Sequence, residues 1–377
     1  MSIYLDNAAT TKPKQEVIDA MMPYLTEEWY NPSALYGRSQ KIKKDIENSR
    51  KVIGGFINAN SDEIFFTSGG SESNCWAIQG FVNYCNRKGK MPAIITSVIE
   101  HKSILSCVDN MNADVHYIGV DNEGHINMIA LNNVLNMASK EGNEILVSIQ
   151  YANNEIGTIQ YIKEIAELVH KYNALFHTDA VQAFGHVHID VKEIDVDMLS
   201  ASGHKIGTPK GIGFLYKKNT VEIDPLIYGT QMDGMRGGTE NVPYIIGMSK
   251  AVELLRDNIP SISKYKTYFM NRLEEEFRCK INGSIISRLP NNISTTFPQN
   301  ITAEALIYLL DMCEIYISSG SACNSHSIEP SYVLKEIGLT DEEAARTVRI
   351  TIPDDVDETL IENIIYEIKK QIALMIC

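Results

Sequence analysis

The stretch Asp197-Met198-Leu199-Ser200-Ala201-Ser202-Gly203-His204-Lys205 places a lysine at the end of a short apolar run that closes in small residues. Such a run is typical of a buried strand, and a free lysine amine, with a pKa of about 10.4, is charged at neutral pH. A charged amine at the end of a buried strand is costly unless the protein uses it. The position of Lys205 therefore raises the question of what its amine does.

One use of such an amine is a Schiff base with an aldehyde cofactor, pyridoxal 5′-phosphate (PLP). The alternative is a surface lysine in a loop, because Gly207, Pro209 and Gly211 follow directly. This segment alone leaves both interpretations open, so the rest of the chain has to decide between them.

Composition limits the classes of function. The 377 residues are 44% hydrophobic and 22% charged, which is ordinary for a globular protein with one large and one smaller domain. The net charge of −14 argues against a nucleic-acid partner. No apolar run is long enough to span a bilayer, and residues 1–7 lack the features of a signal peptide, so we expect a cytoplasmic protein without membrane contact.

Strand and helix patterns alternate along the first two thirds of the chain. Strands are predicted at 63–67, 93–98, 114–118, 144–151, 174–179, 195–200 and 212–216. Helices are predicted from Pro13 onward and over 39–58, 102–111, 127–140 and 161–172, with another after the Gly69-Gly70 pair. This order predicts an α/β fold with a mostly parallel sheet covered on both faces, and a ligand beyond the carboxyl ends of its strands.

The regular alternation of strands and helices ends at about residue 255, after which predicted helices at 262–279 and 357–376 flank short strands such as 347–352. We therefore expect a large domain over 14–255 and a smaller α+β domain formed by 1–13 and 256–377.

Several polar residues follow the predicted strands. Gly70 and Ser71 open a helix and could hold an anion, although an ordinary helix cap is the simpler interpretation. Asp179 could keep a PLP ring nitrogen protonated, with Gln182 reaching the same ligand, or it could cap a helix. His101 could stack on a heterocycle and move protons, or be structural; His204 has the same alternatives.

Two further polar groups have equally open interpretations. Asn154 closes the predicted strand 144–151 at the ligand edge, but asparagine also favours turns. Arg349 lies in the second domain and could clamp a carboxylate or form an inter-domain salt bridge.

The seven cysteines form no CxxC pairs, which argues against a disulfide scaffold and against a zinc site, and no metal is expected. Cys323 is distinctive because small and polar residues surround it, from Ser318 to Ser327. Such a loop is a poor place for a structural cysteine and a good one for a nucleophile that must travel. An exposed, idle thiol is the alternative.

Together these segments resemble the NifS/IscS type of cysteine desulfurase, in the class V aminotransferase group of fold-type I PLP enzymes. The resemblance runs nearly from end to end of the chain. Its motifs include Tyr4 to Thr11, Asn31-Pro32-Ser33, Thr67 to Asn74, Glu100-His101, Ala152 to Gly157, His177 to Ala183, Ser202 to Lys205, Arg236 to Asn241, and Ser318 to Cys323 with Glu329 to Leu334. The motif Ser-Ser-Gly-Ser-Ala-Cys resembles the long-loop group, whose cysteine passes sulfur to partner proteins.

The resemblance implies a role for each matching residue. Lys205 matches the Schiff-base lysine, His101 the residue stacked on the ring, Asp179 the partner of the pyridinium and Gln182 the ligand of the ring hydroxyl. Phosphate ligands are matched by Ser71, Ser202 and His204, and by Thr239, which the other subunit of a homodimer lends. Asn154 and Arg349 match the groups that hold the substrate carboxylate, and Cys323 matches the nucleophile that forms a persulfide.

The implied activity is conversion of L-cysteine to L-alanine, with the sulfur passed to an acceptor protein such as an iron–sulfur scaffold or a tRNA-thiolation enzyme. A related PLP lyase or transaminase, including a selenocysteine lyase, is one alternative, and a dimeric paralogue without turnover is another. Departures from the family pattern include Gly70-Ser71 in place of Ala-Thr, Tyr36 after Asn-Pro-Ser, and the segment 229–239.

Overall fold

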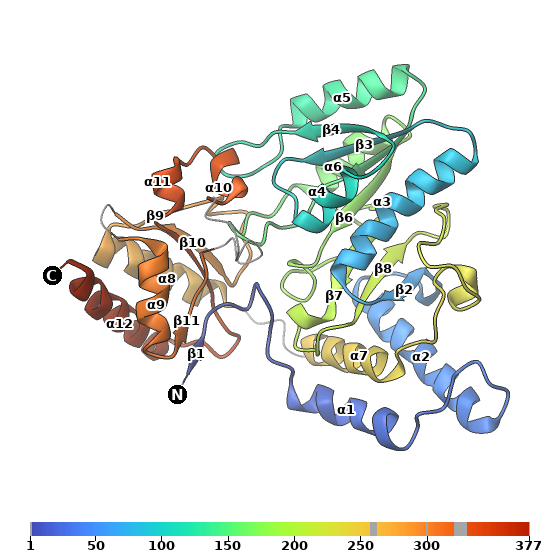
Figure 1. Ribbon diagram of the computed structural model, residues 1–377, viewed down its shortest axis with the longest axis horizontal. Coiled ribbons are helices and arrows are strands. Elements are labelled where there is room, and N and C mark those ends of the chain that lie inside the picture. Colours follow the sequence, from blue (N-terminus) through green and yellow to red (C-terminus); the bar gives the residue numbers. More distant parts are fainter. Residues whose placement is uncertain (1, 257–261, 299–300, 320–329, 377) are drawn as a thin grey trace.

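The computed structural model describes residues 2–256, 262–298, 301–319 and 330–376. Figure 1 shows two lobes, with the N-terminal segment passing from the smaller lobe to the larger. Apart from Leu289, the larger core gathers buried side chains between Val17 and Leu255, and a second core joins Leu5 to side chains between Ile262 and Ile372. The α/β fold is confirmed, whereas the exact domain boundaries at 13/14 and 255/256 stay a prediction.

A seven-stranded sheet forms the centre of the larger lobe, in the order β2-β8-β7-β6-β5-β3-β4. Its strands are β2 (Ile64–Thr67), β3 (Pro92–Ser97), β4 (Asp114–Ile118), β5 (Glu144–Ser148), β6 (Leu175–Asp179), β7 (Met198–Ser202) and β8 (Gly213–Lys217). β8 pairs antiparallel with β2 and β7, and every other neighbouring pair is parallel. The mostly parallel sheet that the apolar runs predict is therefore confirmed.

Helices cover both faces of this sheet, as right-handed crossovers require. The connections containing α3 (Gly70–Arg87) and α4 (Lys102–Val108) run toward β4, whereas those containing α5 (Met128–Lys140) and α6 (Ile162–His170) run back toward β6. The two pairs of helices therefore lie on opposite faces. The direction reverses between β3 and β5, and in such sheets the ligand lies at the carboxyl ends beside this switch.

Three helices pack together beside β2: α1 (Gln15–Thr26), α2 (Gly37–Phe56) and α7 (Val242–Arg256). The sequence predicts Pro13 in the first turn of α1, but that helix begins at Gln15. Lys14 is extended, and its backbone N–H donates to the carbonyl of Gly207 at 3.0 Å, which keeps it outside the helix.

Two other elements are shorter than their sequence patterns predict. β5 ends at Ser148, although Ile149 and Tyr151 still donate backbone hydrogen bonds to β6. The predicted helix 102–111 ends at Val108, where the chain turns. Apolar periodicity continues into both turns because these residues remain packed against the core, so periodicity alone does not mark the ends.

The smaller lobe contains an antiparallel sheet in the order β12-β10-β9. Its strands are β9 (Lys280–Ile281), β10 (Asn292–Thr296) and β12 (Thr347–Thr351), and β1 (Ile3–Tyr4) pairs in parallel with β11 (Ile315–Tyr316). Its helices are α8 (Ser263–Phe277), α9 (Ala303–Asp311), α10 (Tyr332–Glu336), α11 (Asp341–Ala344) and α12 (Glu358–Ile376). Side chains of α10 pack with Ile99 and Ile156 of the larger lobe, which joins the two lobes.

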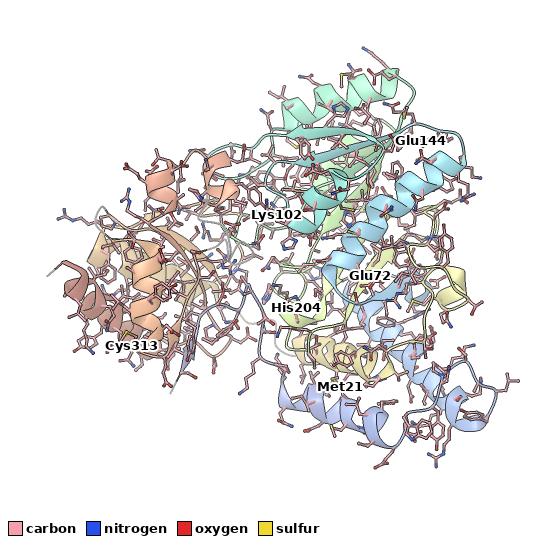
Figure 2. The ribbon with its side chains drawn as sticks, in the orientation of Figure 1. Met21, Glu72, Lys102, Glu144, His204 and Cys313 are labelled. Atoms are coloured by element: carbon pink, nitrogen blue, oxygen red, sulfur yellow. The ribbon has the colours of Figure 1, made fainter. Side chains whose placement is uncertain are left out.

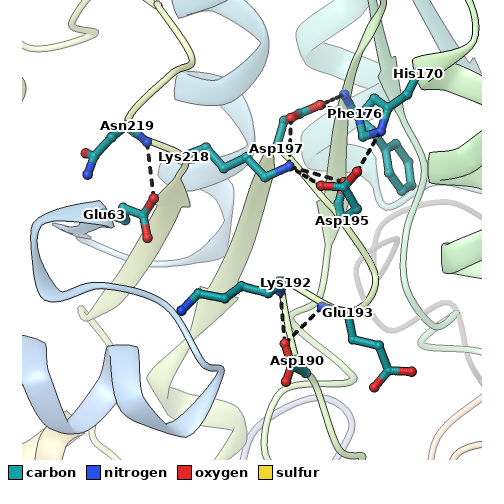
Figure 3. Close-up of polar contacts among 10 residues, drawn as sticks. All are labelled: Glu63, His170, Phe176, Asp190, Lys192, Glu193, Asp195, Asp197, Lys218 and Asn219. Carbon is teal, nitrogen blue, oxygen red and sulfur yellow. Dashed lines mark hydrogen bonds and ion pairs between the residues drawn. The ribbon is translucent and has the colours of Figure 1, made fainter.

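A charged cluster holds the amino-terminal ends of β6 and β7, at the edge of the sheet opposite the carboxyl ends (Figure 3). Asp197 accepts hydrogen bonds from His170 at 2.9 Å and from the backbone N–H of Phe176 at 2.8 Å. Lys218 bridges Asp195 and Asp197 at 2.6 and 3.2 Å. This cluster fixes the two strands whose other ends carry the candidate site.

No helix in the described part of the chain has the length and apolar character needed to cross a bilayer.

Candidate active site

A cavity of about 190 Å³ lies beyond the carboxyl ends of β3, β5, β6 and β7, where the topology predicts a ligand. Nine of the predicted site residues line it: Gly70, Ser71, His101, Asn154, Asp179, Gln182, Ser202, His204 and Lys205. Figure 2 labels His204 and Lys102, which lie on the side of the larger lobe that faces the smaller one. Residues spread over 136 positions of the chain, from Gly70 to Lys205, therefore meet in one cavity.

Lys205 is buried immediately after β7, with 9% of its surface exposed. Its Nζ donates hydrogen bonds to the backbone carbonyls of Ala8 and Ala9, the latter at 2.8 Å. The interpretation as a solvated loop lysine is therefore wrong. The amine lies inside the cavity, held by carbonyl groups that carry no formal charge.

The N-terminal segment supplies these carbonyl groups because it crosses from one lobe to the other. Thr11 is tied to the loop after β7 through hydrogen bonds with the carbonyl of His204 and the N–H of Gly207. Gln182 also donates to the carbonyl of Ala8, at 3.0 Å. Of the motif at residues 4–11, Ala9 lines the cavity, and the carbonyl of Ala8 accepts from both Lys205 and Gln182.

Asp179 ends β6 and is 7% exposed. Its Oδ1 accepts from the backbone N–H of Val181 at 2.9 Å, and its Oδ2 accepts from Nδ2 of Asn74 at 2.7 Å. The Oδ1 atom of Asn74 is buried and has no hydrogen-bond partner among the described residues. An acceptor left open beside a carboxylate suits a ligand that carries an N–H group.

The part of the cavity at the N-terminus of α3 is suited to an anion. The N-terminus of α3 places Gly70 and Ser71 there, with the exposed hydroxyl of Ser71 in its first turn. Ser202 and His204 line the same cavity. Burial, together with the charges of Lys205 and Lys210, lowers the pKa of His204 to about 4, so its ring is neutral at pH 7.

The segment 229–239, which departs from the family pattern, is anchored to this end of the cavity. Arg236 pairs with Glu72 on α3, with its Nε 2.9 Å from Oε1. Burial opposes ionisation of Glu72, but hydrogen bonds from Arg236 and Ser68 outweigh it and hold the pKa of Glu72 below its usual value. The ion pair thus links the segment to the helix that opens at Gly70.

His101 caps the N-terminus of α4 after β3. Its Nδ1 lies 3.1 Å from the backbone nitrogen of Ser103, which donates to it, and 2.8 Å from the Ser103 hydroxyl. Glu100 is fully buried just before it, and burial raises the pKa of Glu100 to about 8. The histidine ring is therefore fixed on its helix beside the cavity.

Arg349 lies outside the cavity lining but next to it. It is buried on β12, where Nη2 is 2.6 Å from Oδ1 of Asp6 and Nη1 donates to the carbonyl of Asn154 at 3.1 Å. The side chain of Asn154 lines the cavity itself. The salt bridge joins Arg349 to Asp6 within the predicted smaller domain and is not inter-domain. The contact with the larger lobe is the hydrogen bond to the carbonyl of Asn154, which places the guanidinium at the boundary between the two lobes.

Besides Arg349, two more predicted residues are not brought into this cavity by the described structure. Thr239 is exposed on the surface segment and does not belong to the lining formed by the described residues. Cys323 falls within 320–329, outside the described residues. Both assignments stay predictions.

Sequence reasoning missed three polar cavity residues, Asn74, Ser103 and Gln150, and did not single out the apolar lining residues Ala9, Ala152 and Val181. Asn74 had a usable signal, since it follows Ser71 by three positions and so shares its helix face. Ser103 had one as well, because a residue two positions after an N-cap supplies the N–H that the cap accepts. Gln150 lies in a stretch that the pattern assigns to a strand, and nothing marks it.

Comparison with known proteins agrees with this geometry. Residues 3–359 match the family described as aminotransferase class-V. The chain belongs to the class V aminotransferase family. Family membership confirms PLP as the cofactor, and the resemblance to NifS/IscS-type cysteine desulfurases is confirmed by the relatives described next.

Curated relatives include proteins named cysteine desulfurase IscS. The one from Methanosarcina thermophila is 43% identical over 95% of this chain and 90% of its own length. The one from Clostridium botulinum strain Hall is also 43% identical, over 95% of this chain and 92% of its own length.

Solved structures of the same kind superpose closely. A NifS-like protein has a TM-score of 0.88 at 30% identity, covering 100% of this chain and 99% of its own. The NifS-like protein from Rickettsia africae ESF-5 has a TM-score of 0.87 at 31% identity, covering 98% and 99%. A structure described as SspA in complex with cysteine has a TM-score of 0.81 at 34% identity, covering 94% and 99%.

The residues present fit PLP. The cavity offers a buried amine for the aldehyde, a carboxylate beside an open acceptor for the ring nitrogen, and a helix N-terminus for the phosphate. Gly70 shapes the phosphate end, because a Cβ there would lie 2.5 Å from Cγ2 of Val181. Lys205, Asp179 and the α3 N-terminus would hold the three ends of the cofactor.

Proposed function

We propose that this chain is a PLP-dependent cysteine desulfurase, which converts L-cysteine to L-alanine and collects the sulfur as a persulfide on Cys323. The observation that carries the proposal is the meeting of Lys205 and Asp179, from the ends of adjacent strands β7 and β6, in one cavity. The relatives named cysteine desulfurase support the choice of substrate.

When bound, PLP supplies an electron-accepting ring for the substrate's α-carbon. Asp179 keeps the ring nitrogen protonated by its negative charge, and Asn74 orients Asp179. The amine of Lys205, which lies in the cavity, would take the α-proton of the substrate. Gln182 would contact the ring hydroxyl, while Ser71, Ser202 and His204 would hold the phosphate.

The carboxylate of the substrate is held by Asn154 and Arg349. Asp6 already accepts from Nη2 of Arg349, so the guanidinium is oriented before substrate arrives. Its position on β12 means that substrate binding draws on both lobes. The contact between Arg349 and the backbone of Asn154 keeps the two carboxylate ligands together.

Cys323 attacks the sulfur of the bound substrate, forming an S–S bond as the Cβ–S bond breaks. The described residues that flank 320–329 support this role. Ser318 forms a backbone bridge with Arg349, while Ser331 donates to Glu155 and Tyr332 donates to the carbonyl of Glu100. The segment that carries the thiol is thus anchored on both sides beside the site.

A homodimer completes the phosphate site through Thr239 of the other subunit. Large apolar side chains are exposed on residues 31–40 and on residues 227–240, which contain Thr239; they include Leu35 at 94% and Tyr228 at 77%. Residues of both segments line a second cavity of about 470 Å³. An exposed apolar surface of this kind is typical of a protein–protein interface.

The persulfide sulfur goes to an acceptor protein, for which an iron–sulfur scaffold and a tRNA-thiolation enzyme are the candidates. The name IscS of the relatives favours the iron–sulfur scaffold.

Product analysis tests the function. Purified protein with PLP and L-cysteine should form L-alanine and persulfide sulfur in equal amounts, the sulfur being released as sulfide when a thiol reductant is added. A keto acid as product would make the enzyme a transaminase, and absence of PLP binding would make it a non-catalytic paralogue.

A further inference from the structure

A continuous chain of hydrogen bonds joins Asp179 to His101 along the wall of the cavity. Asn74 Nδ2 donates to Asp179 Oδ2 at 2.7 Å and to Ser103 Oγ at 3.0 Å. Ser103 Oγ lies 2.8 Å from Nδ1 of His101, and the Ser103 backbone N–H donates to that same nitrogen at 3.1 Å. Four side chains from β6, α3, α4 and the turn before α4 therefore act on one another in series.

The direction of each bond follows from the chemistry of the groups. A carboxylate only accepts, so the amide nitrogen of Asn74 must face Asp179, and its second hydrogen is then directed at Ser103 Oγ. Because that oxygen accepts from Asn74, its own proton is available for Nδ1 of His101. The backbone N–H of Ser103 can only donate, so Nδ1 of His101 accepts in both contacts.

A ring nitrogen that accepts two hydrogen bonds carries no proton. We propose that Asn74 and Ser103 are positioning residues that fix neutral His101 with its proton on Nε2, so that the imidazole presents a proton donor and not a base to the cavity. This inference rests on the proposed function for its catalytic meaning. In that reaction, the Nε2–H group of neutral His101 donates a hydrogen bond to the departing fragment.

Other charged and titratable groups lie near His101. Asp179, Lys205 and His204 line the same cavity, Glu155 lies close enough to interact with His101 by charge, and Lys102 and Glu100 are its chain neighbours. Ser103 carries no charge and acts through hydrogen bonds alone. Changing the Ser103 side chain therefore removes one of the two hydrogen bonds that fix Nδ1 of His101, without altering the formal charge of the site.

The tautomer is measured directly by nitrogen-15 NMR of histidine-labelled, full-length protein with PLP bound at pH 8, with the His101 signals assigned by their loss in His101→Gln. The inference predicts a protonated Nε2 and an unprotonated Nδ1. A proton on Nδ1, or an even mixture of tautomers, would overturn it. The same spectrum of the protein without PLP tests the His101 tautomer separately from the proposed desulfurase activity, because it reports on His101 whether or not the protein turns over cysteine.

Kinetics supply the second readout. Ser103→Ala should lower kcat roughly three- to tenfold, the effect of losing one hydrogen bond of about 1 kcal/mol, with KM within about twofold and an altered pH profile of kcat. Ser103→Thr keeps the hydroxyl and should restore most of kcat. Ser106→Ala, on the exposed side of the same helix, is the matched control. Equal kcat values and pH profiles for Ser103→Ala and wild type would overturn the inference while leaving the desulfurase assignment intact.

Discussion

Gly70 and Val181 face each other at the phosphate end of the cavity, where a Cβ on Gly70 would lie 2.5 Å from Cγ2 of Val181. Gly70 is one of the departures from the pattern of the family that the sequence resembles, in which alanine is usual at this position. In this chain, the branched side chain of Val181 takes the space that such a methyl group would need.

This contact predicts that Gly70→Ala weakens cofactor binding, because an extra methyl group in a packed site costs about 1–3 kcal/mol. The PLP dissociation constant, measured by absorbance titration, should rise at least roughly fivefold. Val181→Ala removes Cγ2 and should restore binding in the double variant. If Gly70→Ala weakened PLP binding equally in the wild-type protein and in Val181→Ala, the contact with Val181 would not be the cause.

Arg349→Lys should raise KM for L-cysteine roughly tenfold and leave PLP binding unchanged. Lysine keeps the charge but loses the planar fork that can hold both Asp6 and a carboxylate. Cysteamine, which lacks the carboxylate, is the internal check: its inhibition constant should not change. Arg38→Lys, at an exposed position, is the matched control. Equal weakening of cysteine and cysteamine would contradict a carboxylate role for Arg349.

Cys323→Ala should keep the bound cofactor and its absorbance while abolishing release of sulfur from L-cysteine. The reason is that the persulfide needs a thiol acceptor, and the substrate sulfur has no other nucleophile assigned to it. Sulfide and alanine assays with Cys313→Ala as the control check this. Full activity of Cys323→Ala would place the sulfur acceptor elsewhere.

The charged cluster of Figure 3 predicts a pH-dependent contribution to stability. The hydrogen bond to Asp197 raises the pKa of His170 from 6.5, so its contribution is complete below that value and is lost as pH rises through the folded pKa. Burial opposes ionisation of Asp197, but hydrogen bonds from His170 and Phe176 hold its pKa below 3.8, so its contribution is lost as pH falls through that lower value. Both contributions are present between about pH 4 and 6.5.

His170→Gln should therefore lower the free energy of unfolding by about 0.5–1 kcal/mol at pH 5.5 and by less at pH 8.5. Urea denaturation at the two pH values measures the difference. His188→Gln, at an exposed position, is the control. A loss of the same size at both pH values would mean that His170 acts by packing and not by charge.

The sequence predicts the parts of this structure that depend on local patterns. Apolar runs give the strands, and small or polar residues after them mark Asp179, Lys205 and His101 at the ligand edge. The direction of β8 is not visible in its own residues, because strand polarity depends on the path of the connection and not on side-chain alternation.

The contacts that hold Lys205 were also beyond sequence reasoning. They come from backbone carbonyls of Ala8 and Ala9, almost 200 positions away, and every residue has such a carbonyl. The chain from Asn74 to His101 depends on the packing of α3 against α4, which no single segment encodes. Side-chain chemistry could be predicted from the sequence, whereas its orientation could not.

The most direct test of the account is to find where PLP is attached. Borohydride reduction of the PLP-loaded protein, followed by tryptic digestion and mass spectrometry, should place the cofactor on Lys205, with no attachment in Lys205→Ala and full attachment in Lys210→Ala, whose lysine is exposed in the following loop. Attachment to another lysine, or none in the wild-type protein, would contradict the account.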